Sequence, residues 1–364
     1  MAADSRRIFN FAAGPALLPV EVLEQIREKL ADWQGSGGSV MEGSHRSQAF
    51  MALASDAESA LRELLVVPES YKLLFLQGGA TGQFAAIPLN LAQPYSIADY
   101  FNTGVWSKKA IAEAGRYCGV RIAADEGASG YTTVPAPEFI RLSHDAAYVH
   151  YTPNETIGGV EFPYVPETGI VPLIADMSST LLSRPLEVSR FGLIYAGTQK
   201  NLGIAGLCIV ILREDLLGRA RPQAPAIWNY QSMAKEGSMV NTPPTFAWYV
   251  AGLVFRWLLK QGGLAAIEAR NRTKAERLYE AIDASGFYKN VVARNCRSRM
   301  NVPFTLIEPE LDATFLNEAR VAGLTNLEGH RSVGGMRASL YNAMPLAGVE
   351  MLVGFMKDFE RRYG

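Results

Sequence analysis

The segment Gly192-Leu-Ile-Tyr-Ala-Gly-Thr-Gln-Lys200-Asn201 decides how this chain is interpreted. It begins as a short apolar run typical of a buried strand and ends on Lys200, ahead of a second apolar run from Leu207 to Leu212. Burial lowers the pKa of an amine, and a neutral amine can attack a carbonyl to form a Schiff base. A lysine after a strand is more often a solvated loop residue, so Lys200 needs support from other residues.

The first supporting residue is Asp176, which ends the upstream apolar run that starts at Val171. An aspartate in this position is usually a helix cap or a turn former. A buried carboxylate one strand before a buried lysine is, however, what a pyridoxal phosphate site requires. The lysine holds the aldehyde, and the carboxylate keeps the pyridine nitrogen protonated so that the ring can accept electrons.

A place for the cofactor's phosphate is predicted further upstream. The apolar run 71–76 leads into Gln77-Gly-Gly-Ala-Thr81 and then into an expected helix over residues 82–91. Glycines let the backbone approach an anion, and a helix N-terminus presents free N–H groups with partial positive charge. The segment fits neither G-x-G-x-x-G nor G-x-x-x-x-G-K-[ST], which argues against a dinucleotide or a nucleoside triphosphate.

Strand-like and helix-like runs alternate over the first two thirds of the chain. Helices are expected over residues 47–65, 82–91 and 104–117, and strands over residues 71–76, 96–101, 146–151, 171–176, 192–196 and 207–212. This alternation predicts an α/β fold with a mostly parallel sheet covered by helices on both faces. Ligands bind such sheets at the carboxyl ends of the strands, where this reading places Gly78, Asp176 and Lys200.

The remainder of the chain predicts a smaller α+β domain. A buried helix over residues 246–260 ends at Gln261-Gly-Gly263, which marks a boundary. Helices to residue 284, over 313–322 and from 346, with strands near 300–307 and 336–340, follow it. We therefore expect a large cofactor-binding domain over residues 16–260 and a small domain over residues 261–364, joined by the N-terminal arm, residues 1–15.

Composition limits the partners and the compartment. The chain has 364 residues and a net charge of −1, which argues against a nucleic-acid or anionic membrane partner. Its three cysteines, Cys118, Cys208 and Cys296, are far apart, which suggests neither a zinc site nor a disulfide framework and suits the cytoplasm. The longest apolar stretch is short and contains Arg256, so it predicts no membrane span, and the N-terminus has no apolar signal segment.

Seven separated motifs resemble those of the phosphoserine aminotransferases, in the class V group of fold-type I pyridoxal phosphate enzymes. They are Ser44-His-Arg46, Gln77-Gly-Gly-Ala-Thr-Gly-Gln-Phe84, His150-Tyr-Thr-Pro-Asn-Glu-Thr156, Ala175-Asp-Met-Ser-Ser179, Tyr195-Ala-Gly-Thr-Gln-Lys-Asn201, Asn241-Thr-Pro-Pro-Thr245 and Gly329-His-Arg-Ser-Val-Gly-Gly-Met-Arg337. The resemblance extends from Phe9 to the C-terminus. It implies the fold-type I transferase architecture, with a seven-stranded sheet, and pyridoxal 5′-phosphate (PLP) as cofactor.

The resemblance also implies a role for each cofactor residue. Lys200 would form the Schiff base and act as the general base that moves the substrate's α-proton, and Asp176 would pair with the pyridine nitrogen. Trp106 would stack on the ring and Thr156 would bind its phenolic oxygen, although by position alone they are a core aromatic and a turn residue. The phosphate would be bound by Ala80, Thr81 and Gln199.

A homodimer with shared active sites is implied as well. Asn241 and Thr242 would reach the phosphate in the neighbouring subunit's site, although their Pro-rich loop alone indicates only a rigid turn. The arm over residues 9–19 is expected near the active site. The chain departs from some relatives at Thr81, where they carry arginine, and at Ala13, where they carry serine.

Substrate selection is expected to rest on cations, because arginine forks match carboxylate and phosphate alike. Arg337 would bind the α-carboxylate. The distal anion would be bound by His45, Arg46, His330 and Arg331, the first two donated by the other subunit. By position alone, these distal residues are ordinary surface charges.

The implied reaction converts O-phospho-L-serine and 2-oxoglutarate into 3-phosphohydroxypyruvate and L-glutamate by a ping-pong mechanism, in serine biosynthesis. The resemblance leaves open whether the chain also forms 4-phosphohydroxythreonine for pyridoxine biosynthesis, as some bacterial members of the family do. The alternatives are a serine–glyoxylate aminotransferase, a cysteine desulfurase with Cys296 as nucleophile, and a non-catalytic PLP-binding protein.

Overall fold

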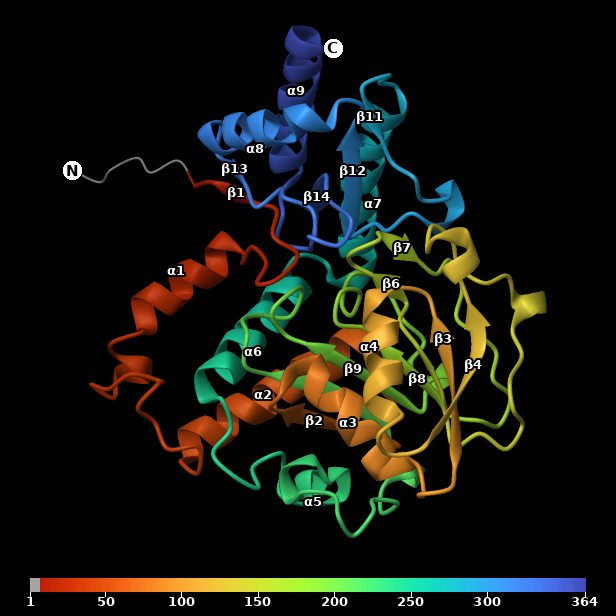
Figure 1. Ribbon diagram of the computed structural model, residues 1–364. Coiled ribbons are helices and arrows are strands. Elements are labelled where there is room, and N and C mark those ends of the chain that lie inside the picture. The colour runs from red at the N-terminus through yellow and green to blue at the C-terminus, as the bar shows by residue number, and fades with distance from the viewer. Residues whose placement is uncertain (1–6) are drawn as a thin grey trace.

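A seven-stranded sheet forms the centre of the molecule (Figure 1). The computed structural model describes residues 7–364, so the first six residues of the predicted arm lie outside it. In spatial order the strands are β2 (Tyr71–Leu76), β10 (Cys208–Arg213), β9 (Leu193–Gly197), β8 (Leu173–Asp176), β5 (Val149–Tyr151), β3 (Ile97–Asn102) and β4 (Gly119–Asp125). The predicted α/β class with a seven-stranded sheet is confirmed.

The sheet is mostly parallel, as predicted, and β10 is the exception. It pairs antiparallel with both β2 and β9, whereas the other neighbouring strands run parallel. The connection from Thr198 to Leu207 is too short for the crossover that a parallel neighbour needs, so the chain turns straight back. The start of β10 therefore lies beside the carboxyl ends of β2, β8 and β9, at one edge of the sheet.

Helices cover both faces of this sheet. On one face lie α2 (Gln48–Leu65) and α6 (Thr245–Lys260), and on the other lie α3 (Gly79–Leu91), α4 (Val105–Ala114) and α5 (Tyr230–Lys235). Strand β10 shows the two-sided burial. Ile209 and Ile211 pack in the core with α2 and α6, while Val210 packs in the core with α3, α4 and α5.

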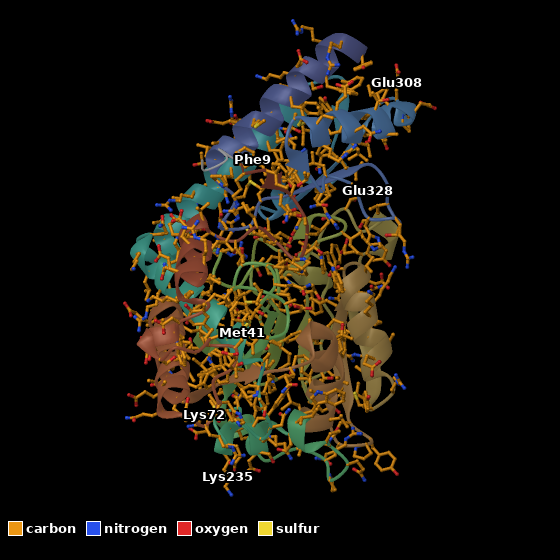
Figure 2. All side chains as sticks on the ribbon, turned by 90° about the vertical axis from the view of Figure 1, so that its left-hand side faces the viewer. Phe9, Met41, Lys72, Lys235, Glu308 and Glu328 are labelled. Atoms are coloured by element: carbon orange, nitrogen blue, oxygen red, sulfur yellow. The ribbon has the colours of Figure 1, made fainter. Side chains whose placement is uncertain are left out.

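The C-terminal part has a core of its own and lies above the large sheet in Figure 1. Its antiparallel strands are β11 (Tyr288–Lys289), β12 (Asn301–Leu306) and β14 (Met336–Ser339), and its helices are α7 (Gly263–Asp283), α8 (Asp312–Val321) and α9 (Leu346–Tyr363). The arm joins this part, because β1 (Phe9–Asn10) pairs in parallel with β13 (Leu324–Thr325). Figure 2 shows Phe9 in the same upper region as Glu308, with Lys72 and Lys235 at the opposite end. The domain boundary at residues 260 and 261 stays a prediction.

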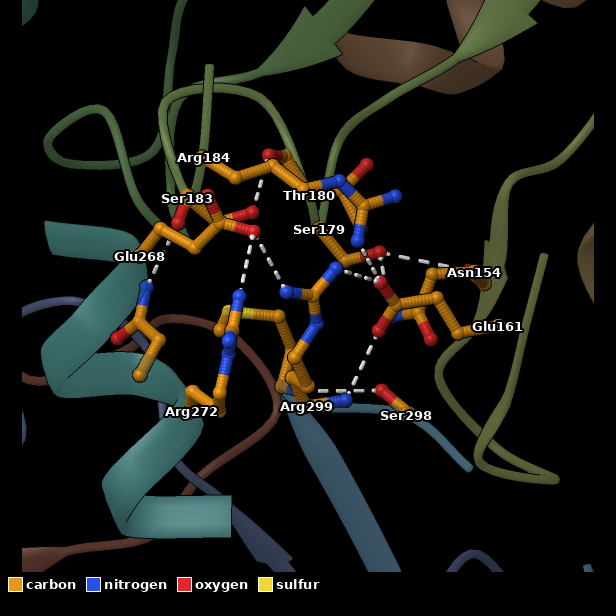
Figure 3. A network of polar contacts seen from close by, with 12 residues as sticks. Asn154, Glu161, Ser179, Thr180, Ser183, Arg184, Glu268, Arg272, Ser298 and Arg299 are labelled. Carbon is orange, nitrogen blue, oxygen red and sulfur yellow. Dashed lines mark hydrogen bonds and ion pairs between the residues drawn. The ribbon is translucent and has the colours of Figure 1, made fainter. Parts of the chain in front are cut away.

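A network of ion pairs joins the two parts (Figure 3). Glu161, in the hairpin of β6 (Asn154–Glu155) and β7 (Val160–Glu161), is buried and pairs with Arg184. The backbone N–H of Arg299 donates to Glu161 Oε2 at 2.8 Å, and its guanidinium donates to Glu268 of α7 at 2.9 Å. The start of β12 is thereby held against a hairpin that contributes residues to the site described below.

The structure differs from the prediction at several elements. Helix α3 begins at Gly79, three residues earlier than expected, because Gly78 and Gly79 adopt positive φ values of 91° and 59° and complete the turn at once. Strand β4 and helix α1 (Val20–Lys29) were not predicted. β4 is an edge strand with much of its surface exposed, so it lacks the continuous apolar run of a central strand.

Among the described helices, none is by itself long and apolar enough to cross a membrane. The consecutive helices α6 and α7 meet the length and composition criteria only as a pair, and they are bent by 85° where they join.

Candidate active site

A cavity of about 590 Å³ opens at the edge where β2, β8 and β9 end. Nine of the residues predicted from the sequence line it: Ala80, Thr81, Trp106, Thr156, Asp176, Gln199, Lys200, His330 and Arg337. Ala13 and Gly14 of the arm line it too, as expected. Side chains from both parts of the chain thus meet in one space.

Asp176 ends β8 and is held in a fixed orientation by Ser178. Its Oδ1 accepts hydrogen bonds from the Ser178 backbone N–H at 3.0 Å and from the Ser178 hydroxyl at 2.6 Å. Burial raises the pKa of this carboxyl, while the Ser178 hydrogen bonds and the positive charge of Lys200 oppose that shift. A buried carboxylate with these partners can neutralise a cation placed beside it.

Lys200 follows β9 and points into the same cavity. Burial lowers the pKa of its amine to about 8, opposed by the charges of Asp176 and Glu155 and reinforced by that of Arg337. Its Nζ lies 5.7 Å from the centroid of the Trp106 ring. A measurable fraction of this amine is therefore uncharged near neutral pH and can act as a nucleophile or a base.

Trp106 is positioned by a buried carboxylate that the predicted site did not include. Glu155, 1% exposed, accepts hydrogen bonds from the backbone N–H groups of Trp106 and Ser107 at 2.9 and 2.8 Å, which caps the start of α4. Trp106 Nε1 donates to the Thr156 hydroxyl at 2.8 Å. Gly104 must lack a side chain here, because a Cβ would lie 2.5 Å from Glu155 Cδ.

The first turn of α3 provides an anion site. Its leading N–H groups, which include those of Ala80 and Thr81, have no acceptor within an α-helix. A Cβ on Gly197 would lie 3.9 Å from Ala80 N and 4.0 Å from Ser178 Oγ. The end of β9, the start of α3 and Ser178 therefore converge on one place with several hydrogen-bond donors.

Arg337 and His330 bring positive charge to the opposite side of the cavity. Arg337, in β14, donates to the Thr156 carbonyl at 3.3 Å, and its Nε is buried without a partner among residues 7–364. Burial lowers the pKa of His330, and the charges of Arg337, Arg331 and Lys109 lower it further. An anion in the cavity would supply the missing acceptor.

Five predicted residues do not line this cavity: His45, Arg46, Arg331, Asn241 and Thr242. Arg46 and Arg331 are exposed. The Gln77 side chain donates to Asn241 Oδ1 at 3.3 Å and to the Thr242 carbonyl at 3.2 Å, which places this loop beside the strand that leads into α3. The roles of His45, Arg46, Asn241 and Thr242 in a neighbouring subunit's site stay predictions.

Thr152 and Asn154 are cavity residues that the sequence analysis missed. Both are buried, and Thr152 Oγ1 and Asn154 Oδ1 have no hydrogen-bond partner in the described part of the chain. They alternate with Thr156 after β5. Residues two apart in an extended segment point to the same side, so the spacing of Thr152 and Asn154 from Thr156, within the motif His150–Thr156, could have identified them.

Comparison with known proteins agrees with this geometry. Residues 8–352 match the Aminotransferase class-V family. The chain belongs to that family. This class-V aminotransferase is 60% identical to the phosphoserine aminotransferase of Hahella chejuensis over 98% of its own length and 99% of the relative.

Two solved structures show how far the likeness extends. The phosphoserine aminotransferase of Bacillus circulans subsp. alkalophilus has a TM-score of 0.97 and 46% identity, with 99% of this chain and 100% of that chain covered. The phosphoserine aminotransferase of Trichomonas vaginalis, solved with PLP bound, has a TM-score of 0.91 and 43% identity, with 96% and 100% covered. The predicted fold-type I architecture is confirmed for this class-V aminotransferase.

Proposed function

We propose that this class-V aminotransferase transfers an amino group between O-phospho-L-serine and 2-oxoglutarate, giving 3-phosphohydroxypyruvate and L-glutamate, with PLP as cofactor. One observation carries the proposal. A single cavity combines the buried carboxylate–amine pair of Asp176 and Lys200 with Arg337, whose buried Nε has no partner in the described residues. The identity of 60% to a phosphoserine aminotransferase supports the same substrate class.

The residues of the cavity fit PLP. The oriented Asp176 carboxylate suits a protonated pyridine nitrogen, the first turn of α3 suits a phosphate, and Trp106 offers an aromatic face. When bound, PLP supplies an aldehyde that bonds to amino groups and a ring that accepts electrons. Ala80, Thr81, Thr156 and Gln199 would hold it together with Asp176 and Lys200.

The chain's own groups then perform proton transfer and binding. Lys200 Nζ, with a pKa of about 8, can take a proton from a substrate carbon and return it elsewhere. The guanidinium of Arg337 binds the α-carboxylate common to both amino-acid substrates. His330 and Arg331 attract the distal phosphate or carboxylate.

The position of Cys296 argues against the cysteine desulfurase alternative. A cysteine desulfurase needs a reactive thiol on an accessible loop. Cys296 is 1% exposed and is not among the residues that line the cavity.

The second alternative, a serine–glyoxylate aminotransferase, would have no use for distal cations such as His330.

The deciding experiment follows glutamate production by the purified holoenzyme from 2-oxoglutarate with phosphoserine or serine as amino donor. We expect strong preference for phosphoserine, and preference for unphosphorylated serine would reject the proposal. 4-Phosphohydroxythreonine, tested in the same assay, decides whether the pyridoxine-pathway substrate is used. A yellow protein whose absorbance glutamate leaves unchanged would indicate a PLP-binding protein without this activity.

We also propose a homodimer with shared active sites, located in the cytoplasm. Support comes from His45, Arg46, Asn241 and Thr242, which match the family motifs but do not line the cavity of their own chain. Mixing Arg46→Leu chains, which should use phosphoserine poorly, with inactive Lys200→Ala chains tests the sharing. Because half of random dimers are mixed and one site in each is intact, activity should return to about a quarter of wild type. No recovery after verified subunit exchange would contradict shared sites.

Glu155→Gln should weaken PLP binding by about tenfold or more. The amide keeps one acceptor oxygen but turns an N–H₂ toward a backbone donor of Trp106 or Ser107. A buried unsatisfied donor costs about 1–3 kcal/mol, so we expect the start of α4 to shift and to move Trp106 from its place against PLP. Gly104→Ala should give a similar loss, because its Cβ would overlap Glu155. Absorbance titration with PLP measures both. Gly354→Ala, with no atom within 4 Å of its added Cβ, is the control. Unchanged affinity in both site variants would remove Glu155 from this role.

The reactivity of Lys200 in the cofactor-free protein should rise with pH through a midpoint near pH 8. Burial lowers its pKa, so the amine is mostly charged and unreactive below that value and mostly neutral above it. Pulse acylation at a series of pH values, followed by peptide mass mapping, gives the midpoint. A midpoint near 10.4, the value of a solvated lysine, would show that the amine is not desolvated.

A further inference from the structure

Helix α4 holds a lysine beside a tryptophan of the cavity. Trp106 lies in its first turn, and Lys109 follows three residues later, on the same face of the helix. The Lys109 ammonium lies 4.5 Å from the centroid of the Trp106 ring. Trp106 lines the cavity, and Lys109, which is exposed and is not itself a lining residue, lies against that ring, so its charge acts on the cavity from its outer side.

The positive charges around this cavity lack carboxylate partners. Lys109, Lys200, His330, Arg331 and Arg337 form no ion pair with any carboxylate of residues 7–364. The charge of Lys109 acts on His330, since it is one of three cations that lower the pKa of that imidazole. The Glu155 carboxylate on the inner side of α4 already accepts two backbone N–H groups. The charge of Lys200 is balanced in part by Asp176 and Glu155, whereas the other four cations form no ion pair among the described residues and attract anions.

The neighbouring lysine provides a contrast. Lys108 is also exposed, but its ammonium lies 4.0 Å from the centroid of the Tyr131 ring. Neither lysine lines the cavity, but Trp106 does and Tyr131 does not, and Lys108 is not among the cations that lower the pKa of His330. Two adjacent lysines of one helix therefore lie against different aromatic residues, one belonging to the site and one not.

We propose that Lys109 is a specificity-determining residue that favours substrates with a dianionic distal group over those with a monoanionic one. The inference rests on the proposed function. Above pH 7 a phosphate monoester carries close to two negative charges and the distal carboxylate of glutamate carries one. At equal distance, the Coulomb energy with the Lys109 ammonium is twice as large for the phosphate. If the loss of this charge lowers kcat/KM by a certain factor for glutamate, it should therefore lower kcat/KM for phosphoserine by the square of that factor.

The test compares Lys109→Gln with Lys108→Gln at pH 8 and low ionic strength. Both variants lose one charge from the same helix. For Lys109→Gln we expect kcat/KM to fall about tenfold for phosphoserine and about threefold for glutamate, mainly through KM. Lys108→Gln should change either value by less than about twofold, because its ammonium lies against Tyr131, which is outside the cavity, and is screened by solvent. Lys109→Arg should restore the preference, and added salt should reduce the difference between wild type and Lys109→Gln.

Each other outcome has a definite meaning. Equal losses for the two substrates in Lys109→Gln, or equal effects of Lys108→Gln and Lys109→Gln, would overturn the inference while the proposed function stands. PLP content, measured by absorbance in every variant, shows whether Trp106 still supports the cofactor. If the wild-type enzyme itself fails to use phosphoserine, the proposed function is rejected, and the inference about Lys109 is rejected with it.

Discussion

Lys200→Ala should lower transamination by at least about 10⁴-fold and leave the fold and part of the PLP binding intact. Proton transfer by a positioned base contributes about 10²–10⁴-fold, and the loss of the amine that bonds to the cofactor adds to this. Asp176, the first turn of α3 and Trp106 remain in place to hold PLP, because none of them depends on Lys200 for a hydrogen bond. Single-turnover assays with phosphoserine and a PLP titration measure the two effects separately.

Two controls isolate the amine from the side chain's bulk. Lys200→Arg keeps a positive charge but cannot supply a neutral amine, so it should be as inactive as the alanine variant. Small external amines should partly restore turnover in Lys200→Ala and not in Lys200→Arg, where the side chain fills the space. Appreciable turnover by Lys200→Ala without added amine would refute the assignment. Borohydride reduction of the holoenzyme followed by peptide mapping should label Lys200 and no other residue.

The sequence predicted the residues that terminate central strands. Asp176 and Lys200 each follow an apolar run that is buried on both faces of the sheet, and such runs are readable without tertiary information. Because the strands are parallel, their carboxyl ends share an edge, so the meeting of these two residues could be expected before the structure was seen. Strand β4 escaped prediction because most of its residues are at least partly exposed, so it has no continuous buried apolar run.

Residues that act through other residues were harder to predict. Glu155 accepts a hydrogen bond from the backbone of Trp106, which lies 49 residues earlier in the chain, and no local pattern indicates that contact. Asn154 donates to Asn301, 147 residues away, and so connects the cavity with β12. By contrast, Ser178 lies two residues from Asp176, and the tendency of an aspartate to bind nearby backbone and hydroxyl groups could have identified it.

Arg337→Lys should lower kcat/KM about 10²–10⁴-fold for phosphoserine and for glutamate alike. Lysine keeps the charge but loses the planar fork that binds a carboxylate with two parallel hydrogen bonds. Each lost charge-assisted hydrogen bond costs about 1.5–3 kcal/mol, and the two together give this range. The effect should be equal for both substrates because both carry an α-carboxylate. Steady-state kinetics in each direction of the reaction measure it.

The matched comparison for Arg337 is Arg331→Leu, which removes a cation expected to contact only the distal group. That variant should weaken phosphoserine more than glutamate and should leave amino acids without a distal anion nearly unaffected. Arg337→Lys should impair the use of every amino acid tested. In the wild-type protein the Arg337 guanidinium donates one N–H to the Thr156 carbonyl, and its buried Nε has no partner among the described residues and is available to a substrate carboxylate. If the loss in Arg337→Lys were confined to phosphoserine, Arg337 would belong to the distal site, and the α-carboxylate would need another partner in the cavity.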